Sequence, residues 1–227
     1  MSVRGDLVRS RGAATALSEP SDAGGASGVV GSRNPYERSG MEDSAMAKTP
    51  EKPFLTDVMM LRKRAREHIM EGAVTPGYTA DRETVLKLLN EALATEIVCV
   101  LRYKRHYFMA EGIAADAVKA EFLQHANEEQ QHADQIAARI VQLNGEPNLN
   151  PEGLTSRSHA EYVEGEDLID MIKEDLVAER IAIDSYREMI NYVGDRDTTT
   201  KRMLEGILAM EEEHADDLVG LLQEMDK

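Results

Sequence analysis

Apolar residues recur every three or four positions along most of the chain after about residue 80, which is the spacing of one face of an α-helix. The pattern predicts four long helices, at about 81–111, 114–143, 167–192 and 198–225. Helix-ending residues follow three of them, namely Gly112, the sequence NGEP at 144–147, and Gly194. No stretch alternates apolar and polar residues as a strand does, so the sequence predicts an all-α fold.

The connections between these helices predict how they are arranged. Short turns join the first helix to the second and the third to the fourth, whereas a long segment, NLNPEGLTSRSHAEYVEG at 148–165, joins the second to the third. Four amphipathic helices connected in this way form a four-helix bundle with one long crossover. A shorter amphipathic helix is expected before the bundle, at about 55–72.

The N-terminal segment has a different composition from the rest of the chain. Residues 1–50 include SEPSDAGGASGVVGSRNP, which is rich in Ser, Gly and Pro and shows no helical period. We therefore expect a disordered tail at 1–50 and a single bundle domain, with its accessory helix, at 51–227. Met41 and Met46 are alternative start sites that would leave most of this tail untranslated.

Charge limits the class of partner. The formal net charge is −16, and residues 1–48 hold six basic and six acidic side chains, so the whole excess of negative charge lies in residues 49–227. Such a domain repels nucleic acid and attracts cations. We expect no nucleic-acid partner.

Other features bear on localisation. Cys99 is the only cysteine, so neither an intrachain disulfide nor a metal site of several cysteines can form, and a reducing cytoplasm is the simplest interpretation. No apolar run approaches the ~18 residues of a membrane-spanning helix, and no apolar segment of a signal peptide follows the N-terminal arginines. We expect a cytoplasmic protein with no membrane partner.

Each of the four predicted helices carries a glutamate in the middle of its own apolar stripe. Two of these glutamates begin the sequence Glu-x-x-His, which places a histidine on the same helix face. The six residues are Glu96, Glu129, His132, Glu179, Glu211 and His214.

Their chemistry predicts a metal centre. Four buried carboxylates without partners would be very costly, and two histidines cannot neutralise them, whereas two divalent or trivalent cations can. One Glu from each of two helices, with Glu-x-x-His from each of the other two, is the ligand set of di-iron and di-manganese bundles. A single Glu-x-x-His is common on an acidic helix surface. Here, however, Glu96 precedes Glu129 by 33 residues and Glu179 precedes Glu211 by 32, which indicates a repeated hairpin and a pseudo-two-fold site.

Three further residues lie near these positions in the sequence. Tyr103 shares the stripe of Glu96 and is the candidate catalytic residue, because it could hydrogen-bond near the metals or supply an electron; a core tyrosine is the alternative. His125 lies one turn before Glu129, as an outer group of the centre or as a packed histidine. His106 has no evident partner in the sequence.

At these residues the chain resembles the ferritin superfamily, and bacterioferritins in particular, over about residues 81–225. The resemblance rests on LNEALATEI around Glu96, HANEEQQHAD around Glu129, GEPNLN, GEDLIDMIKEDLVAE up to Glu179, and EEEHAD at 211–216. It implies that Glu96 and Glu179 are terminal ligands, that Glu129 and Glu211 bridge two metals, and that His132 and His214 each cap one. Tyr103 matches the family's tyrosine near the centre.

The resemblance also implies an activity. Bacterioferritins are ferroxidases, so the expected function is oxidation of Fe(II) by O2 or H2O2 for iron storage or detoxification. Two iron ions per subunit are expected, with manganese as the alternative metal, and the protein is expected to form a homo-oligomer.

Two departures from the family change these expectations. The haem-binding methionine that follows the bridging Glu of the second helix is replaced by Gln130, whose amide is a poor axial ligand for iron, so haem is not expected. The family's short fifth helix has no counterpart before Lys227. A miniature cage or a smaller oligomer therefore becomes an alternative to the family's full-size shell.

Two other functions remain as alternatives. One is a di-metal peroxidase or catalase of the rubrerythrin or manganese-catalase type, although a single cysteine cannot build a rubredoxin module. The other is a DNA-protecting miniature ferritin. The charge-neutral tail argues against that reading, and so does the presence of all six predicted ligands within one chain.

Overall fold

The computed structural model describes residues 56–113 and 115–225, so the expected tail at 1–50 lies outside the described residues. Four long helices make up most of the described residues: α2 (Arg82–Met109), α3 (Ala115–Gln142), α5 (Leu168–Val193) and α6 (Thr198–Met225). Each end lies within about two residues of its predicted position. The described ranges contain no strand, and the predicted all-α fold is confirmed.

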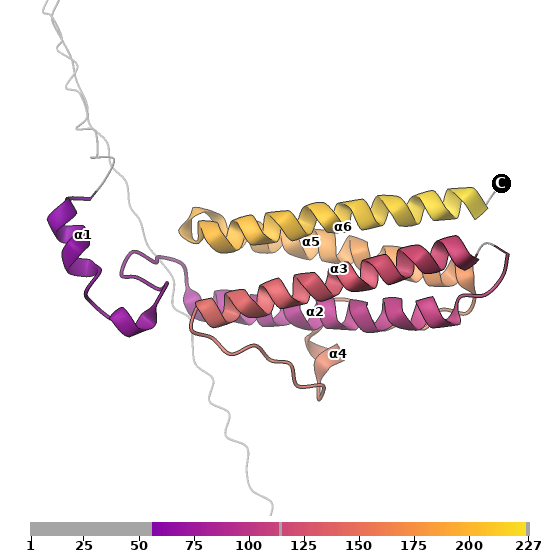
Figure 1. Cartoon of the computed structure of the whole chain (residues 1–227), viewed down its shortest axis with the longest axis horizontal. Helices are drawn as coiled ribbons and strands as arrows, with labels where there is room; N and C mark the ends of the chain where they lie inside the picture. The colour runs from indigo at the N-terminus through magenta and orange to yellow at the C-terminus, as the bar shows by residue number, and fades with distance from the viewer. Residues whose placement is uncertain (1–55, 114, 226–227) are drawn as a thin grey trace, which may run out of the picture. The chain divides into compact units, whose positions relative to one another are not determined.

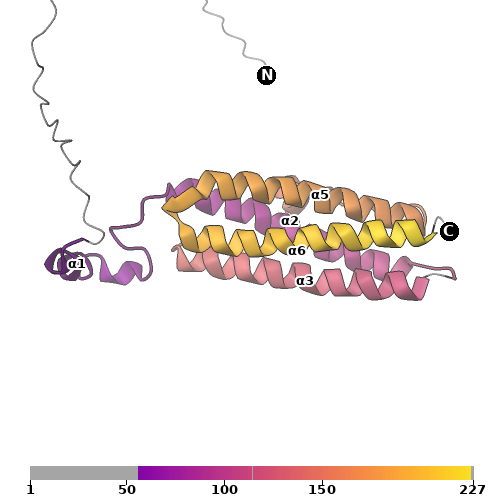
Figure 2. The ribbon, with the colours of Figure 1, turned by 90° about the horizontal axis from the view of Figure 1, so that it is seen from above.

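The helices form two hairpins that pack face to face (Figures 1 and 2). Helix α2 pairs with α3, and α5 pairs with α6, while α2 also lies beside α5 and α3 beside α6. The connection from α3 to α5 includes the short helix α4 (Leu154–Arg157), which contacts α2. The chain thus forms the predicted four-helix bundle with one long crossover.

The expected N-terminal helix is shorter than the predicted 55–72. Helix α1 covers only Val58–Arg64, and a 3₁₀ helix, η1 (Ile69–Glu71), follows after His68, whose φ of 50° lies in the left-handed region. The carboxylate of Asp57 caps α1 by accepting from the backbone N–H groups of Met59 and Met60. None of the α1 side chains is buried, so no packed apolar face extends the helix beyond two turns.

Local sequence signals explain where the bundle helices begin and end. Asp81 and Asp167 cap α2 and α5, and each accepts from a backbone N–H three residues later. Asp197 does the same for α6 at 2.9 Å from the Thr200 nitrogen. Helix α5 ends at Gly194, whose φ of 52° favours glycine. None of the helices in the described ranges is long and apolar enough to cross a membrane.

The interior of the bundle contains two apolar clusters with polar residues between them. One cluster includes Leu89, Ile136 and Leu204, and the other includes Phe122 and Leu218. The predicted ligand residues occupy the positions between these clusters along the four helices. The two clusters therefore fix the helix rotation that turns those side chains inward.

Candidate metal centre

The six predicted ligand side chains meet in the interior of the bundle, and none is more than 5% exposed. Their ligand-type atoms form two groups, in each of which all atoms lie within 4.8 Å of one another. The first group is Glu96, Glu129, His132 and Glu211, and the second is Glu129, Glu179, Glu211 and His214. Because Glu129 and Glu211 belong to both groups, the arrangement is two adjoining cation-sized sites with two shared carboxylates.

His132 faces the first group. Its Nδ1 lies 3.0 Å from Glu211 Oε1, 3.3 Å from Glu129 Oε2 and 3.4 Å from Glu96 Oε2. Bonds of about 2.1 Å in tetrahedral geometry leave ligand atoms roughly 3.4 Å apart, so a transition cation fits among these atoms with little movement.

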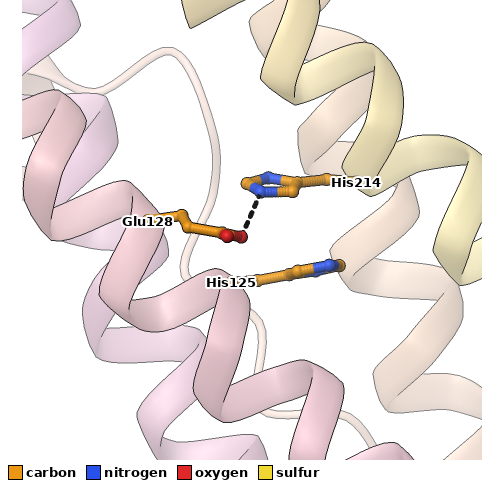
Figure 3. Close-up of side chains that lie close together, drawn as sticks. All are labelled: His125, Glu128 and His214. Atoms are coloured by element: carbon orange, nitrogen blue, oxygen red, sulfur yellow. Dashed lines mark hydrogen bonds and ion pairs between the residues drawn. The ribbon is translucent and has the colours of Figure 1, made fainter.

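His214 faces the second group in the same manner. Its Nδ1 lies 3.4 Å from Glu129 Oε1, 3.6 Å from Glu211 Oε2 and 3.8 Å from Glu179 Oε2. Its other ring nitrogen, Nε2, is bonded at 3.0 Å to Glu128 Oε2 (Figure 3). When Nε2–H donates to this carboxylate, Nδ1 keeps a lone pair for a metal, as is usual for metal-binding histidines.

The buried atoms that lack a hydrogen-bond partner support a cation at this position. In the described ranges, eight buried side-chain nitrogen and oxygen atoms have no partner, and six of them belong to the centre. These six are Glu96 Oε2, Glu129 Oε1, Glu179 Oε2, both carboxylate oxygens of Glu211, and His214 Nδ1. Unpaired buried polar atoms are rare and costly, so their concentration here fits a site built to hold positive charge.

The electrostatics show what the centre does before a metal binds. Burial and the neighbouring Glu129 raise the pKa of Glu96 well above its usual range, and burial with the charges of Glu96 and Glu179 raises the pKa of Glu211 to about 8. Burial alone would lower the pKa of His132, but the carboxylates of Glu129, Glu211 and Glu96 around its Nδ1 raise it to about 12. These pKa values mean that the side chains hold protons at neutral pH, which a bound cation would displace.

Two buried tyrosines hold the carboxylates that are not shared. The hydroxyl of Tyr103 donates to Glu179 Oε1, and the hydroxyl of Tyr186 donates to Glu96 Oε1. Burial and the nearby carboxylates raise the pKa of both tyrosines, so both stay protonated and can donate. Tyr103 is thus placed at the centre, and Tyr186 lies there too, although the sequence motifs did not single it out. It could have been found, because it follows Glu179 by seven residues, as Tyr103 follows Glu96.

A small cavity leads to the centre from outside the bundle. Its volume is about 220 Å³, and it lies between α3 and α6, where His132 forms part of its wall. Glu128, Gln131 and Gln135 give it a polar lining from α3. It offers a route for a small ion or molecule to reach His132.

Two other residues considered in the sequence have clear positions. Gln130, at the family's haem-methionine position, is exposed, and its amide donates to Asp134 Oδ1 at 3.0 Å. The absence of haem stays a prediction. His106 does have a partner, Asp175, whose Oδ2 lies 2.8 Å from its Nδ1, and Asp175 also pairs with the buried Arg102 at 2.8 Å. This pairing joins α2 to α5 and was not evident from the sequence.

A single-crossover bundle with inward-facing carboxylates is the architecture of ferritin-like proteins. The chain belongs to the ferritin family, since the family model described as the ferritin-like domain matches residues 86–227. Among curated relatives, it is similar to the bacterioferritin of Mycobacterium bovis, with 32% identity over 144 residues that cover 63% of this chain and 86% of that protein. It is also similar to the bacterioferritin of Rhodobacter capsulatus, with 33% identity over 138 residues that cover 58% and 78%.

Solved structures agree with this assignment. A dodecameric thioferritin from Bacteroides fragilis, described as bacterioferritin-related, matches with a TM-score of 0.63 and 33% identity over 65% of this chain and 89% of that one. Dps from Thermosynechococcus elongatus matches with a TM-score of 0.60 but only 20% identity, over 62% and 90% of the two chains, and shows the shared fold alone.

Proposed function

We propose that the protein is a ferroxidase that oxidises Fe(II) at a di-iron centre within each chain, for iron storage or detoxification. The observation that carries this proposal is the pair of buried ligand groups that share Glu129 and Glu211. In this reading those two glutamates bridge two iron ions, Glu96 and Glu179 are terminal ligands, and His132 and His214 each cap one ion.

The residues of the chain account for the direction of the reaction. Four carboxylates fixed in a buried site stabilise Fe(III) more than Fe(II), because each added positive charge interacts strongly with ligands that water does not screen. Two Fe(II) supply two electrons, which with two protons reduce one O2 to H2O2, or one H2O2 to water. The protons that Glu211 and His132 hold before metal binds leave as iron enters.

Tyr103 and Tyr186 have a positioning role in this scheme. Each holds one oxygen of a terminal glutamate by hydrogen bonding, which leaves the second oxygen, unpaired in the structure, to face the metal. Tyr103 is in addition our candidate for a redox-active residue, because it lies against both Glu179 and His125.

Assembly is the second part of the proposal. We propose a homo-oligomer in the cytoplasm, supported by the dodecameric state that is named for the B. fragilis relative. Oxidised iron would then collect in the interior of a hollow particle. Mass and iron content in solution test this: many irons per chain in a large particle support storage, and a compact dimer with about two metals per chain contradicts it.

The activity itself is tested by the rate of Fe(II) oxidation in air. We expect fast oxidation by the wild-type protein and a loss of about 100-fold or more in Glu129→Ala, which removes a shared ligand. Glu213→Ala, an exposed glutamate on α6, is the matched control and should keep the wild-type rate. Equal rates in the wild type and Glu129→Ala would overturn the proposal. Bound manganese with rapid release of oxygen from H2O2 would instead identify a catalase.

A further inference from the structure

A further group of side chains with ligand-type atoms lies beside the centre, where the two hairpins of the bundle differ. His125 lies seven residues before His132, and the corresponding residue before His214 is Ile207. His125 is fully buried, and its ring stacks on that of His214 with 4.1 Å between the centroids. The bundle thus carries one extra imidazole on one side of an otherwise repeated site.

The hydrogen bonds around His125 determine which of its nitrogens is free. The hydroxyl of Tyr103 donates to Glu179, so its oxygen can only accept from His125 Nδ1, which lies 3.3 Å away. Nδ1 must therefore carry the ring proton, an assignment that follows from the network of bonds. In the neutral ring the other nitrogen, Nε2, then presents a lone pair, and it has no hydrogen-bond partner although it is buried.

Two carboxylates face this lone pair. Asp217 Oδ2 from α6 lies 3.6 Å from His125 Nε2, and Glu121 Oε2 from α3 lies 3.8 Å from it. Three atoms of this kind, all electron-pair donors and none of them a proton donor, repel one another unless a cation lies between them. Their separations are close to the roughly 3.4 Å expected between the ligands of a tetrahedral transition cation.

We propose that Glu121, His125 and Asp217 form a third metal site, separate from the six-residue centre, for one divalent transition cation. The carboxylates of Glu121 and Asp217 are 35% and 44% exposed, so the cation can enter from solvent and exchange. Two carboxylates and one imidazole suit Fe(II), Mn(II) or Zn(II) better than Ca(II). Water completes the coordination on the open side.

The site adjoins the di-metal centre through Glu128. Figure 3 shows the carboxylate of this residue at the edge of the stacked rings of His125 and His214, where it is hydrogen-bonded to His214 Nε2. Glu128, His125 and His214 themselves lie close enough together to share a cation. A cation at His125 could therefore pass to His214 through Glu128. The third site can in this way hold a metal that enters or leaves the centre.

The other hairpin has no equivalent site, which makes the stoichiometry informative. The positions that correspond to Glu121, His125 and Asp217 are Met203, Ile207 and Gln135, which cannot bind a hard cation together. The proposal therefore requires one additional cation per chain rather than two. An odd total is a result that a symmetric di-metal protein does not give.

Calorimetric titration of the metal-free full chain with Zn²⁺, which is not oxidised, tests the proposal. We expect about three Zn²⁺ per chain in the wild type and about two in the double variant Glu121→Gln/Asp217→Asn. Since even outer-shell partners are worth 10–100-fold in metal affinity, loss of two ligands should weaken the third site more than about 100-fold. The matched control is Asp116→Asn/Asp216→Asn, which removes two exposed carboxylates from the same two helices.

The control should still bind about three Zn²⁺, with helical circular dichroism unchanged in both variants. Two Zn²⁺ in the wild type, or three in Glu121→Gln/Asp217→Asn, would overturn the third site. Failure of the di-metal centre looks different: the wild type would then bind about one Zn²⁺, and the double variant none.

Discussion

The hairpin α2–α3 and the hairpin α5–α6 are near repeats at the centre of the bundle and differ next to it. Each supplies a lone glutamate, a Glu-x-x-His and a tyrosine seven residues after the lone glutamate. The tyrosine of each hairpin bonds to the lone glutamate of the other, so the repeat holds in space as well as in sequence. Positions shared by both halves are thus those that face the centre.

The two hairpins differ next to the centre, both in the residues that face it and in the ion pairs that join the hairpins. His125 on α3 faces carboxylates, whereas Ile207 on α6 packs in an apolar cluster. The ion pairs between the hairpins also differ. Arg102 and Asp175 join α2 to α5, whereas Arg139 on α3 pairs with Asp197 at the start of α6. In contrast to the centre, both ion pairs have hydrogen-bond partners for their buried atoms. The two satisfied ion pairs stabilise the fold, whereas the unpaired atoms of the centre are the basis of the proposed metal site.

The largest effect on stability is expected from breaking the buried ion pair between Arg102 and Asp175. Asp175→Ala leaves Arg102, which is 1% exposed, without its carboxylate. An uncompensated buried charge costs about 3–5 kcal/mol, so the free energy of unfolding of the metal-free protein should fall by that amount. Urea denaturation followed by circular dichroism measures it. A loss below about 1 kcal/mol would show that Arg102 finds solvent or another partner.

The shared carboxylates test whether the two halves are equivalent. Glu129→Gln and Glu211→Gln should each slow aerobic Fe(II) oxidation by about 100-fold or more, equivalent to about 2.7 kcal/mol, because each removes charge from both metal positions. In the metal-free protein, Glu211→Gln should change stability little, because the lost contact with His132 at 3.0 Å is offset by removal of the repulsion from Glu96 and Glu179 that, with burial, raises the pKa of Glu211 to about 8. Stopped-flow absorbance and urea denaturation measure the two effects. Loss of oxidation in only one variant would break the equivalence.

The two tyrosines provide a sharper comparison. Tyr103→Phe and Tyr186→Phe each remove one buried hydrogen bond to a glutamate, so each should lower the free energy of unfolding by about 1.5–3 kcal/mol. If both only position their glutamates, Fe(II) oxidation should slow by the same small factor in both variants. A much larger loss in Tyr103→Phe alone would assign it the electron-transfer role that we expect of a catalytic residue.

The smallest effect concerns the pH dependence of stability that arises from the ion pair between Arg139 and Asp197. Burial raises the pKa of Asp197, but hydrogen bonds from Thr200 and the charge of Arg139 outweigh it and lower the pKa below its usual value. A carboxyl group with a lowered pKa stabilises the fold above the unfolded-state value of about 3.9 and loses that contribution as pH falls through the folded-state value. Stability should therefore decline below about pH 4, and less steeply in Asp197→Asn. Identical profiles in acid denaturation would contradict the assignment.

Much of this comparison could be predicted from the sequence. The helix period placed Glu96 and Glu179 on buried stripes, and the spacing to the two Glu-x-x-His motifs revealed the repeat. The six residues do meet in the interior. That they bind metal stays a prediction.

The rest depended on contacts between helices. The pairing of Arg102 with Asp175 joins residues 73 positions apart, and no local pattern marks it. The role of His125 could not be decided from the sequence. Its Nε2 is free only because Tyr103 donates its hydroxyl hydrogen to Glu179 on α5 and so accepts from His125 Nδ1. The N-terminal helix was predicted too long because its apolar residues follow a helical period, yet none of α1 is buried in the structure.

Diffraction at the iron absorption edge, from crystals loaded with Fe(II) without oxygen, tests the central claim most directly. We predict two anomalous peaks per chain inside the bundle, both within ligand distance of Glu129 and Glu211, with one capped by His132 and the other by His214. A third peak at His125 would belong to the separate site. No peak among the six side chains, or a single one, would contradict the account of a di-iron centre.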